Sequence, residues 1–282
     1  MNIGVLSELW RYPVKSFGGE KLVCGEIHNQ GLVADRCWAL QDLNGDIVNG
    51  KNCPKILQLS AYYSASVHEG VAYGDQIAST DVVFPNGIIL NSRDDRIHRT
   101  ISEFIEKDVR LLALQPPEDL EHYRLSDVAC AERDALPNLS ETSADIKQLL
   151  KHFSCPPGSY VDAYPIHMLT RNALRELKHE SQGDADARRF RPNIIIESEY
   201  DAEAFPEFDW IGRGLQIGGA LFKVDSRTLR CAMPARAIPQ FGLPPAPEVN
   251  GTLHRLTDRF LGVNLLVVKS GRVSLGDPIL LI

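Results

Sequence analysis

Residues 215–224 have the sequence LQIGGALFKV, in which two short apolar runs flank the dipeptide Gly218-Gly219. Short apolar runs bounded by glycine are typical of β-strands joined by a turn. Similar runs occur at residues 194–197, 265–269 and 278–282, with further turns at Ser270-Gly271 and Gly276-Asp277. This spacing predicts that the C-terminal half of the chain forms a small mixed β-barrel.

The N-terminal half is also expected to consist mainly of strands. Asn44-Gly45 and Asn86-Gly87 lie between β-type segments, and Asn-Gly is a strong local signal for a β-hairpin. The strands are expected at residues 3–12, 22–28, 37–41, 59–67 and 109–114.

Helices are expected at residues 94–107, 145–153, 170–178 and 251–261. In the first of these segments the isoleucines and Phe104 lie on one face, and the remaining positions are mostly charged. Thr170 is a suitable N-cap for the third helix, because its hydroxyl oxygen can accept a hydrogen bond from a backbone N–H of the first turn.

The segment Gln115-Pro116-Pro117 interrupts both patterns, because proline removes a backbone donor and restricts the residue before it. We place the domain boundary there, which divides the chain into residues 1–115 and 120–282. The sequence therefore predicts a mixed α/β, β-rich fold with two domains.

Composition excludes several classes of function. The chain has 282 residues, of which 44% are hydrophobic, so it can bury a sizeable core. The formal net charge is −7 and the basic residues are scattered, which argues against non-specific nucleic-acid binding. No apolar run approaches the roughly 20 residues of a membrane span, and residues 1–16 contain three charged side chains where a signal peptide would be apolar. We therefore expect a cytoplasmic protein without membrane contact.

The cysteines are Cys24, Cys37, Cys53, Cys130, Cys155 and Cys231. They include no CxxC pair and no cluster with histidine, so neither a zinc nor an iron–sulfur site is expected. The chain also lacks GxSxG, HExxH, a Walker loop and a GxGxxG fingerprint, so a function must rest on a dispersed site.

Two kinds of chemistry are suggested by the remaining polar residues. A phosphate or another dianion needs guanidinium, ammonium and hydroxyl donors, which five residues could supply: Lys15, Ser16, Arg36, Arg191 and Asn193. Cys231 follows Arg230 directly and Arg227 by four positions, an electropositive setting that favours a thiolate. A thiolate is a suitable ligand for a soft or high-valent metal ion.

Structural roles explain the same residues equally well on spacing alone. Cys231 could be a small buried hydrophobe, and Arg36 could form a surface ion pair with Asp35. Residues 189–191 could be a solvated strand start, and Thr170 could serve only as a helix cap. His167 lies in an apolar run and is expected in the core or a cavity rather than as a ligand.

In this order, the motifs resemble those of the MOSC superfamily, the molybdenum cofactor sulfurase C-terminal-like proteins. They are YPVKS at 12–16, GLVADRCW at 31–38, RFRPN at 189–193, RC at 230–231, GVN at 262–264 and GDP at 276–278. The resemblance implies a MOSC N-terminal β-barrel domain at residues 1–115. It also implies a MOSC β-barrel with flanking helices at residues 120–282, which binds the molybdenum cofactor.

The functional relatives suggested by this pattern are the mitochondrial amidoxime reducing component and bacterial reductases of N-hydroxylated compounds. The resemblance implies a molybdenum–molybdopterin cofactor, not pyridoxal phosphate, a small-molecule substrate, and a separate flavin or iron–sulfur reductase that donates electrons. It makes Cys231 the catalytic metal ligand. The cofactor contacts it implies are Lys15, Ser16, Arg36, Thr170, Arg191, Asn193, Arg230 and Asn264.

The chain departs from the amidoxime reducers around the expected ligand. Leu229 precedes Arg230 where they often have serine, residues 232–236 replace a threonine-rich continuation, and residues 237–250 are rich in proline. Because this segment follows Cys231 directly, we expect it to shape the substrate side of the pocket. Two alternatives to a reductase stay open: a carrier of persulfide sulfur or mature cofactor that uses Cys231, and a binding module that has lost the metal.

Overall fold

The computed structural model describes residues 1–65, 67, 73–126, 144–199 and 203–282. Contacts divide the chain into two compact units, of which the first contains residues 1–11, 20–33 and 164–282 and the second residues 12–19 and 34–163. Both units therefore combine separate stretches of the chain. Each of the two family domains predicted at residues 1–115 and 120–282 is instead one continuous stretch.

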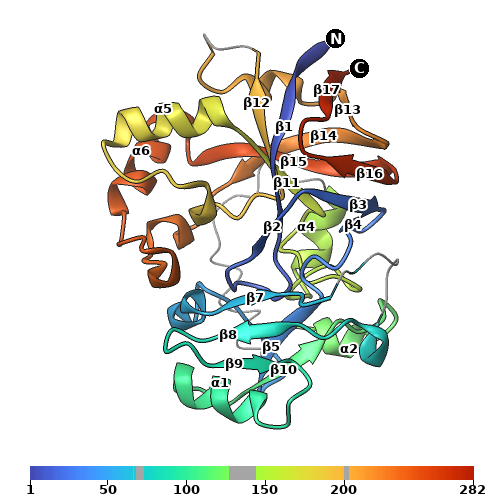
Figure 1. Ribbon diagram of the computed structural model, residues 1–282, viewed down its shortest axis with the longest axis vertical. Coiled ribbons are helices and arrows are strands. Elements are labelled where there is room, and N and C mark those ends of the chain that lie inside the picture. Colours follow the sequence, from blue (N-terminus) through green and yellow to red (C-terminus); the bar gives the residue numbers. More distant parts are fainter. Residues whose placement is uncertain (66, 68–72, 127–143, 200–202) are drawn as a thin grey trace. The chain divides into compact units, whose positions relative to one another are not determined.

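The first unit contains a closed β-barrel. Within the described chain its seven strands follow the order β12-β11-β15-β14-β13-β17-β1, and a pairing of β1 with β12 closes the ring. The blue strand β1 lies beside yellow β12 and red β17 in Figure 1. The strands are β1 (Asn2–Arg11), β11 (Ile166–Thr170), β12 (Ile194–Ser198), β13 (Gly214–Ile217), β14 (Ala220–Leu229), β15 (Phe260–Lys269) and β17 (Pro278–Leu281). The predicted C-terminal barrel is thus confirmed, but it includes the first strand of the chain.

Buried apolar side chains explain why these segments form a barrel. In β1, Ile3, Leu6 and Leu9 are buried with Ile194 and Ile196 of β12, together with apolar residues of the other barrel strands. Burying each such aliphatic side chain contributes roughly 1.5–3 kcal/mol. The interior is therefore a packed apolar core.

Short strands and helices complete the first unit. β2 (Glu20–Leu22) pairs with β1, and a three-stranded sheet has the order β16-β3-β4. Its strands are β3 (Cys24–His28), β4 (Gly31–Leu32) and β16 (Gly271–Ser274). The helices are α5 (Arg171–Ser181), α6 (Pro247–Thr257), and the 3-10 turns η3 (Ala187–Arg189), η4 (Pro206–Trp210), η5 (Met233–Ala235) and η6 (Pro239–Phe241).

Helix α5 connects β11 to β12, which pair in parallel, and it lies beside α6 in Figure 1. The predicted N-cap is confirmed, because Oγ1 of Thr170 accepts a hydrogen bond from the backbone N–H of Ala173 at 3.1 Å. The predicted helix at 251–261 was wrong at both ends. Asp258 takes a left-handed conformation that ends α6, and the buried residues from Phe260 onward belong to β15.

The second unit contains two three-stranded sheets, β10-β5-β6 and β7-β8-β9, within the described residues. Both Asn-Gly hairpins are confirmed, one between β5 and β6 and one between β8 and β9. The strands are β5 (Trp38–Asp42), β6 (Ile47–Val48), β7 (Ser60–Tyr62), β8 (Asp81–Val83), β9 (Ile89–Asn91) and β10 (Val109–Ala113). The helices are α1 (Ile97–Ile105), α2 (Leu120–Tyr123), α4 (Ala144–Leu150), and the 3-10 turns η1 (Pro54–Gln58) and η2 (Gly74–Gln76).

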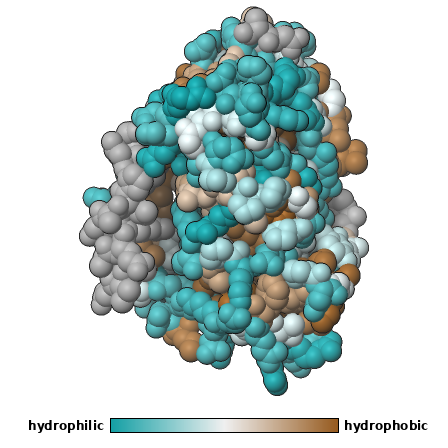
Figure 2. All heavy atoms as spheres, turned by 90° about the vertical axis from the view of Figure 1, so that its left-hand side faces the viewer, coloured by the Kyte–Doolittle hydropathy of each residue, from teal (hydrophilic) through white to brown (hydrophobic). Residues whose placement is uncertain are grey.

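The predicted helix at residues 94–107 is α1, which buries Ile97, Ile101 and Ile105 as its periodicity indicated. The strand predicted at residues 59–67 is shorter, since β7 ends at Tyr62. None of the helices among the described residues is long and apolar enough to span a bilayer. On the face drawn in Figure 2, hydrophilic residues predominate and hydrophobic residues lie in small groups.

Two glycines of the first unit should respond oppositely to alanine. Gly251 lies inside α6, where an added methyl group would meet open space, so Gly251→Ala should raise the free energy of unfolding by about 0.5–1 kcal/mol. Gly262 in β15 has a φ of +73°, and a Cβ there would lie 2.4 Å from the Met168 carbonyl oxygen. Gly262→Ala should therefore lower that free energy by roughly 1–3 kcal/mol. Urea unfolding of both variants tests this, and an unchanged Gly262→Ala midpoint would contradict the close approach.

Candidate functional site

Backbone strain marks the predicted anion-binding segments. Of the eight non-glycine residues with positive φ in the described chain, four lie at helix C-termini: Glu106, Gln182, Asp258 and Arg259. The other four are Ser16 (φ 67°), Ala34 (φ 62°), Arg36 (φ 52°) and Arg191 (φ 53°). This conformation costs an L-residue roughly 1–2 kcal/mol. Strain that is not explained by a helix end therefore coincides with three of the residues predicted to bind the cofactor, a pattern common at functional sites.

In the second unit, positive charge gathers around one carboxylate. Lys15 is buried, and its ammonium donates to Oδ1 of Asp162 at 2.6 Å and to the Tyr160 carbonyl oxygen at 2.8 Å. Lys15 holds the pKa of the Asp162 carboxyl well below its usual range, and Lys51 and Arg36 lower it further. Three cations thus act on the same carboxylate, and Asp162 and Asp35 offset two of their charges, which leaves one net positive charge.

Arg36 is held by two neighbours. Its guanidinium is hydrogen-bonded to Asp35 and lies over the Tyr12 ring, 5.0 Å from the centroid. Asp35 also accepts a hydrogen bond from the backbone N–H of Tyr12 at 2.7 Å. The side chains of Arg36 and Asp35 are only 13% and 3% exposed, so the alternative of a surface ion pair is wrong. The pair forms, but it is mostly buried and fixes Arg36 in a defined position.

Ser16, which follows Lys15, is bonded to the segment that carries Lys51, a residue that the sequence did not suggest. Its hydroxyl oxygen accepts a hydrogen bond from the backbone N–H of Gly50 at 3.1 Å, which fixes the segment that carries Lys51. No local pattern links Lys51 to residues 12–16, and only the folded chain brings them together.

In the first unit, Cys231 lies two residues beyond the end of β14, and it is exposed. The alternative of a small buried hydrophobe is therefore wrong. The Cys231 carbonyl oxygen accepts a hydrogen bond from Nδ2 of Asn250 in α6 at 3.3 Å. Arg227, which was expected to influence the thiol, has its guanidinium over the Phe260 ring at 4.2 Å.

Arg230 is fixed by His167 and by the segment 189–193. Its Nη2 donates to the Phe190 carbonyl oxygen at 2.7 Å, and its Nη1 lies 3.2 Å from Nε2 of His167. The same Nε2 lies 3.4 Å from the Leu261 carbonyl oxygen, so it accepts from Arg230 in one tautomer of the ring and donates to Leu261 in the other. The backbone of His167 is in turn bonded to Asn193, whose N–H donates to the His167 carbonyl oxygen at 2.8 Å. His167 therefore links two of the predicted cofactor contacts, a role that its place in an apolar run did not reveal.

Asn264 and Thr170 have clear structural roles. Asn264 accepts a hydrogen bond from the Thr228 hydroxyl at 2.8 Å and donates to Oγ of Ser226 at 3.1 Å, which ties β15 to β14. Thr170 has no exposed surface, and besides capping α5 its hydroxyl donates to Oε2 of Glu207 at 2.7 Å. A cofactor contact of either residue stays a prediction.

Glu207 of η4 was not suggested by the sequence. Its side chain is fully buried, and Oε1 has no hydrogen-bond partner in the described chain. Burial raises the pKa of Glu207 to about 7, and the hydrogen bond from Thr170 offsets only part of this effect. The carboxyl of Glu207, which is bonded to the N-cap residue of α5, is therefore largely protonated below neutral pH.

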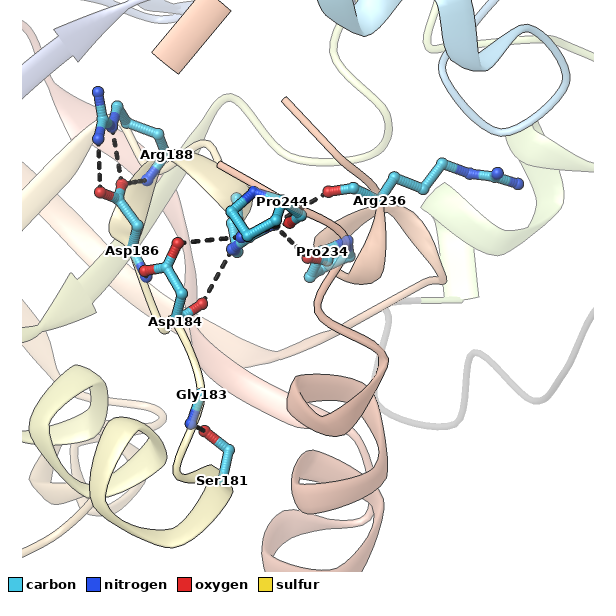
Figure 3. Close-up of polar contacts among 9 residues, drawn as sticks. Ser181, Gly183, Asp184, Asp186, Arg188, Pro234, Arg236 and Pro244 are labelled. Atoms are coloured by element: carbon cyan, nitrogen blue, oxygen red, sulfur yellow. Dashed lines mark hydrogen bonds and ion pairs between the residues drawn. The ribbon is translucent and has the colours of Figure 1, made fainter. Parts of the chain in front are cut away.

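Arg189 anchors the segment that follows Cys231. Its guanidinium is fully buried and donates to the carbonyl oxygens of Arg236 at 3.0 Å and Pro244 at 2.8 Å. Asp184 lies 3.0 Å from the guanidinium and compensates its charge. Figure 3 shows this cluster, with Asp184 on one segment and Pro234, Arg236 and Pro244 on the other. The alternative that residues 189–191 are a solvated strand start is thus wrong for Arg189.

The raised pKa of Glu207 predicts a pH-dependent stability. Below about pH 4.5 the acid is protonated in both the folded and the unfolded chain, and its contribution is fully present. As pH rises toward 7, only the unfolded chain ionises, so the free energy of unfolding falls by about 1.4 kcal/mol per pH unit. Glu207→Gln should remove this loss. Denaturant unfolding of both proteins from pH 4.5 to 7.5 tests it, and a constant difference over that range would mean that Glu207 titrates like an exposed acid.

Comparisons with known proteins identify the family of the chain. The MOSC N-terminal beta barrel domain model matches residues 3–84, and the MOSC domain model matches residues 157–280. Mitochondrial amidoxime reducing component 2 of Bos taurus is 24% identical over 305 residues, with 98% of this chain and 83% of the relative covered. Mitochondrial amidoxime-reducing component 1 of Danio rerio is 25% identical, with 98% and 84% covered.

A second kind of relative is the molybdenum cofactor sulfurase of Drosophila ananassae, which is 26% identical over 286 residues. The alignment covers 95% of this chain but 33% of that protein, so the chain corresponds to about a third of it. With a MOSC N-terminal β-barrel domain and a MOSC domain matched in this order, the chain belongs to the MOSC family.

Proposed function

We propose that this protein is a molybdenum-cofactor-dependent oxidoreductase that reduces N-hydroxylated compounds with electrons from a separate flavin or iron–sulfur reductase. The observation that carries the proposal is the exposed thiol of Cys231, a residue whose backbone carbonyl oxygen is bonded to Asn250 and which follows the immobilised Arg230. Relatives named amidoxime reducing components, aligned over nearly the whole chain, support the substrate class. A cytoplasmic location belongs to the same proposal.

The residues of each unit suit the chemical groups of a molybdenum–pterin cofactor. In the first unit, an exposed thiol is the ligand that a soft metal prefers, and Arg191 and Arg230 supply positive charge. In the second unit, Lys15, Lys51 and Arg36 act on one carboxylate, which is the charge environment that a phosphate favours. We assign Cys231 as the metal ligand and Lys15, Ser16 and Arg36 as phosphate contacts, with Asn193 beside Arg191.

The proposed reaction breaks the N–O bond of the substrate, consumes two electrons and two protons, and releases the N–H product and water. When bound, the cofactor supplies the two-electron redox chemistry. The chain itself supplies the thiolate, the positive charges that retain the cofactor, and the anchored segment after Cys231. Because the chain has no flavin or nicotinamide fingerprint, the electrons come from a partner protein.

A second candidate function is favoured by the same exposed thiol and by the relatives named molybdenum cofactor sulfurase. In it, the Cys231 thiolate attacks the outer sulfur of a donor persulfide, which forms a persulfide on Cys231 and releases the donor thiolate. Such a carrier would contain labile sulfur on Cys231 and little molybdenum, whereas a reductase would contain molybdenum and turn over substrate.

Replacing the proposed metal ligand should abolish the activity. Cys231→Ala is expected to lose bound molybdenum and all reduction of hydroxylamine-like compounds, while the fold is kept because an exposed thiol contributes little packing. Molybdenum and pterin content, turnover with an artificial electron donor and thermal unfolding are measured on protein from a host that makes the cofactor.

Cys24→Ala is the matched control, because Cys24 is a partly buried thiol of β3 in the same unit. It should keep both molybdenum and turnover. Wild-type turnover in Cys231→Ala would reject the assignment of Cys231 as the metal ligand. If Cys231→Ala changes no binding of cofactor or substrate, the alternative of a binding module without metal is favoured.

Removing a proposed phosphate contact should weaken cofactor retention. Lys15→Ala or Arg36→Ala each removes a charge-assisted contact worth roughly 1.5–3 kcal/mol, which corresponds to about a tenfold to hundredfold loss of affinity. Molybdenum content after dialysis measures the effect. Lys21→Ala is the control, because this lysine is exposed and pairs with Glu8 instead. Equal molybdenum content in all variants would argue against the phosphate assignment.

A further inference from the structure

The loop that follows Cys231 is held by its main chain. We define it as residues 232–246. Arg189 donates to the carbonyl oxygens of Pro234, Arg236 and Pro244, at 3.4, 3.0 and 2.8 Å. Within the loop, the N–H of Ile238 donates to the Leu243 carbonyl oxygen at 2.9 Å. These bonds fix the path of the loop, so a side chain that it carries starts from a rigid position.

The loop is closed by a hydrogen bond within it, and the helix that follows it is bonded to Cys231. The N–H of Ala246 donates to the Ala235 carbonyl oxygen at 2.9 Å, which closes the loop on itself. Four residues later, Asn250 donates to the carbonyl oxygen of Cys231. The loop is thus closed on itself, and it begins directly after the proposed metal ligand, whose carbonyl oxygen is bonded to Asn250.

Arg236 is a cation of the loop that forms no ion pair within the described chain. In Figure 3 its side chain extends away from the Arg189 cluster, and its Nε is buried with no hydrogen-bond partner among the described residues. Two other arginines near the loop, Arg188 and Arg189, do form ion pairs. Arg188 pairs with Asp186 at 2.6 Å and Arg189 with Asp184 at 3.0 Å. Burying part of a guanidinium without an anion is unfavourable, and a bound carboxylate would relieve it.

Asn250 provides a second buried polar atom without a hydrogen-bond partner among the described residues. Its Nδ2 is used by the Cys231 carbonyl oxygen, but its Oδ1 is buried with no hydrogen-bond partner in the described chain. An amide oxygen accepts a hydrogen bond from an N–H or O–H group. The chain after Cys231 therefore offers a buried donor on Arg236 and a buried acceptor on Asn250.

We propose that Arg236 determines substrate specificity by binding the carboxylate of an acidic N-hydroxylated compound, whose N–OH group faces Asn250. A guanidinium presents two parallel N–H groups that match a carboxylate, which a lysine cannot reproduce. This inference rests on the proposed reductase activity and names its substrate class. The same guanidinium could instead serve the phosphate of the cofactor, and the experiment separates the two.

The test compares a neutral and an acidic hydroxamic acid, benzhydroxamic acid and its 4-carboxylate. In Arg236→Gln, the KM for the carboxylate should rise about tenfold to a hundredfold, while kcat and both constants for the neutral compound stay unchanged. Arg236→Lys should recover only part of the preference. Arg255→Gln is the matched control, because Arg255 is exposed on α6 and pairs with Glu180 at 3.0 Å. Equal changes for both compounds, or loss of molybdenum from Arg236→Gln, would overturn the proposal.

A binding measurement separates this inference from the proposed activity. Calorimetric titration of the purified protein with both compounds, without an electron donor, reports affinity in the absence of turnover. Tighter binding of the carboxylate that Arg236→Gln abolishes would support the ligand class even if no reduction occurs. Equal affinity for the two compounds would overturn it even in an active enzyme.

Discussion

The antiparallel pairing of β1 with β12 joins the beginning of the chain to a strand almost two hundred residues later, and the barrel depends on it. Leu9 lies opposite Ile194 in this pairing, and Gly4 lies opposite Ser198. Just beyond the ladder, the N–H of Trp10 donates to the Asn193 carbonyl oxygen at 2.8 Å. The segment with Arg189, Arg191 and Asn193 is therefore positioned by the closure of the barrel, and through Arg189 the loop after Cys231 is positioned as well.

Much of the secondary structure was predictable because its causes are local. An Asn-Gly dipeptide defines a hairpin by its own conformational preference, and the isoleucines of α1 reveal their buried face by spacing alone. The ends of α6 and β15 were not predictable in this way, because buried contacts decide where Phe260 belongs. Closure of the barrel could not be inferred either, since nothing local to β1 specifies partners from the far end of the chain.

The residues of the candidate site also differ in how far the sequence reveals them. Cys231, Lys15 and Arg36 stand in short motifs whose chemistry is evident from neighbouring residues. Arg189 and His167 have contacts with residues 45 to 94 positions away, so their importance appears only in the folded chain. Glu207 is similar, because its unusual protonation follows from burial against Thr170, and burial of an acid is rarely evident from sequence.

The way in which Arg189 holds the loop has an evolutionary consequence. On the loop, its guanidinium donates to main-chain carbonyl oxygens, those of Pro234, Arg236 and Pro244, and every amino acid carries such an oxygen. Mutations that exchange side chains of the loop therefore leave the anchor intact, provided that the new residues tolerate the same backbone path. Descendants of one ancestral protein can diversify the side chains after Cys231 while they inherit the same loop conformation, which separates the evolution of selectivity from the preservation of the fold.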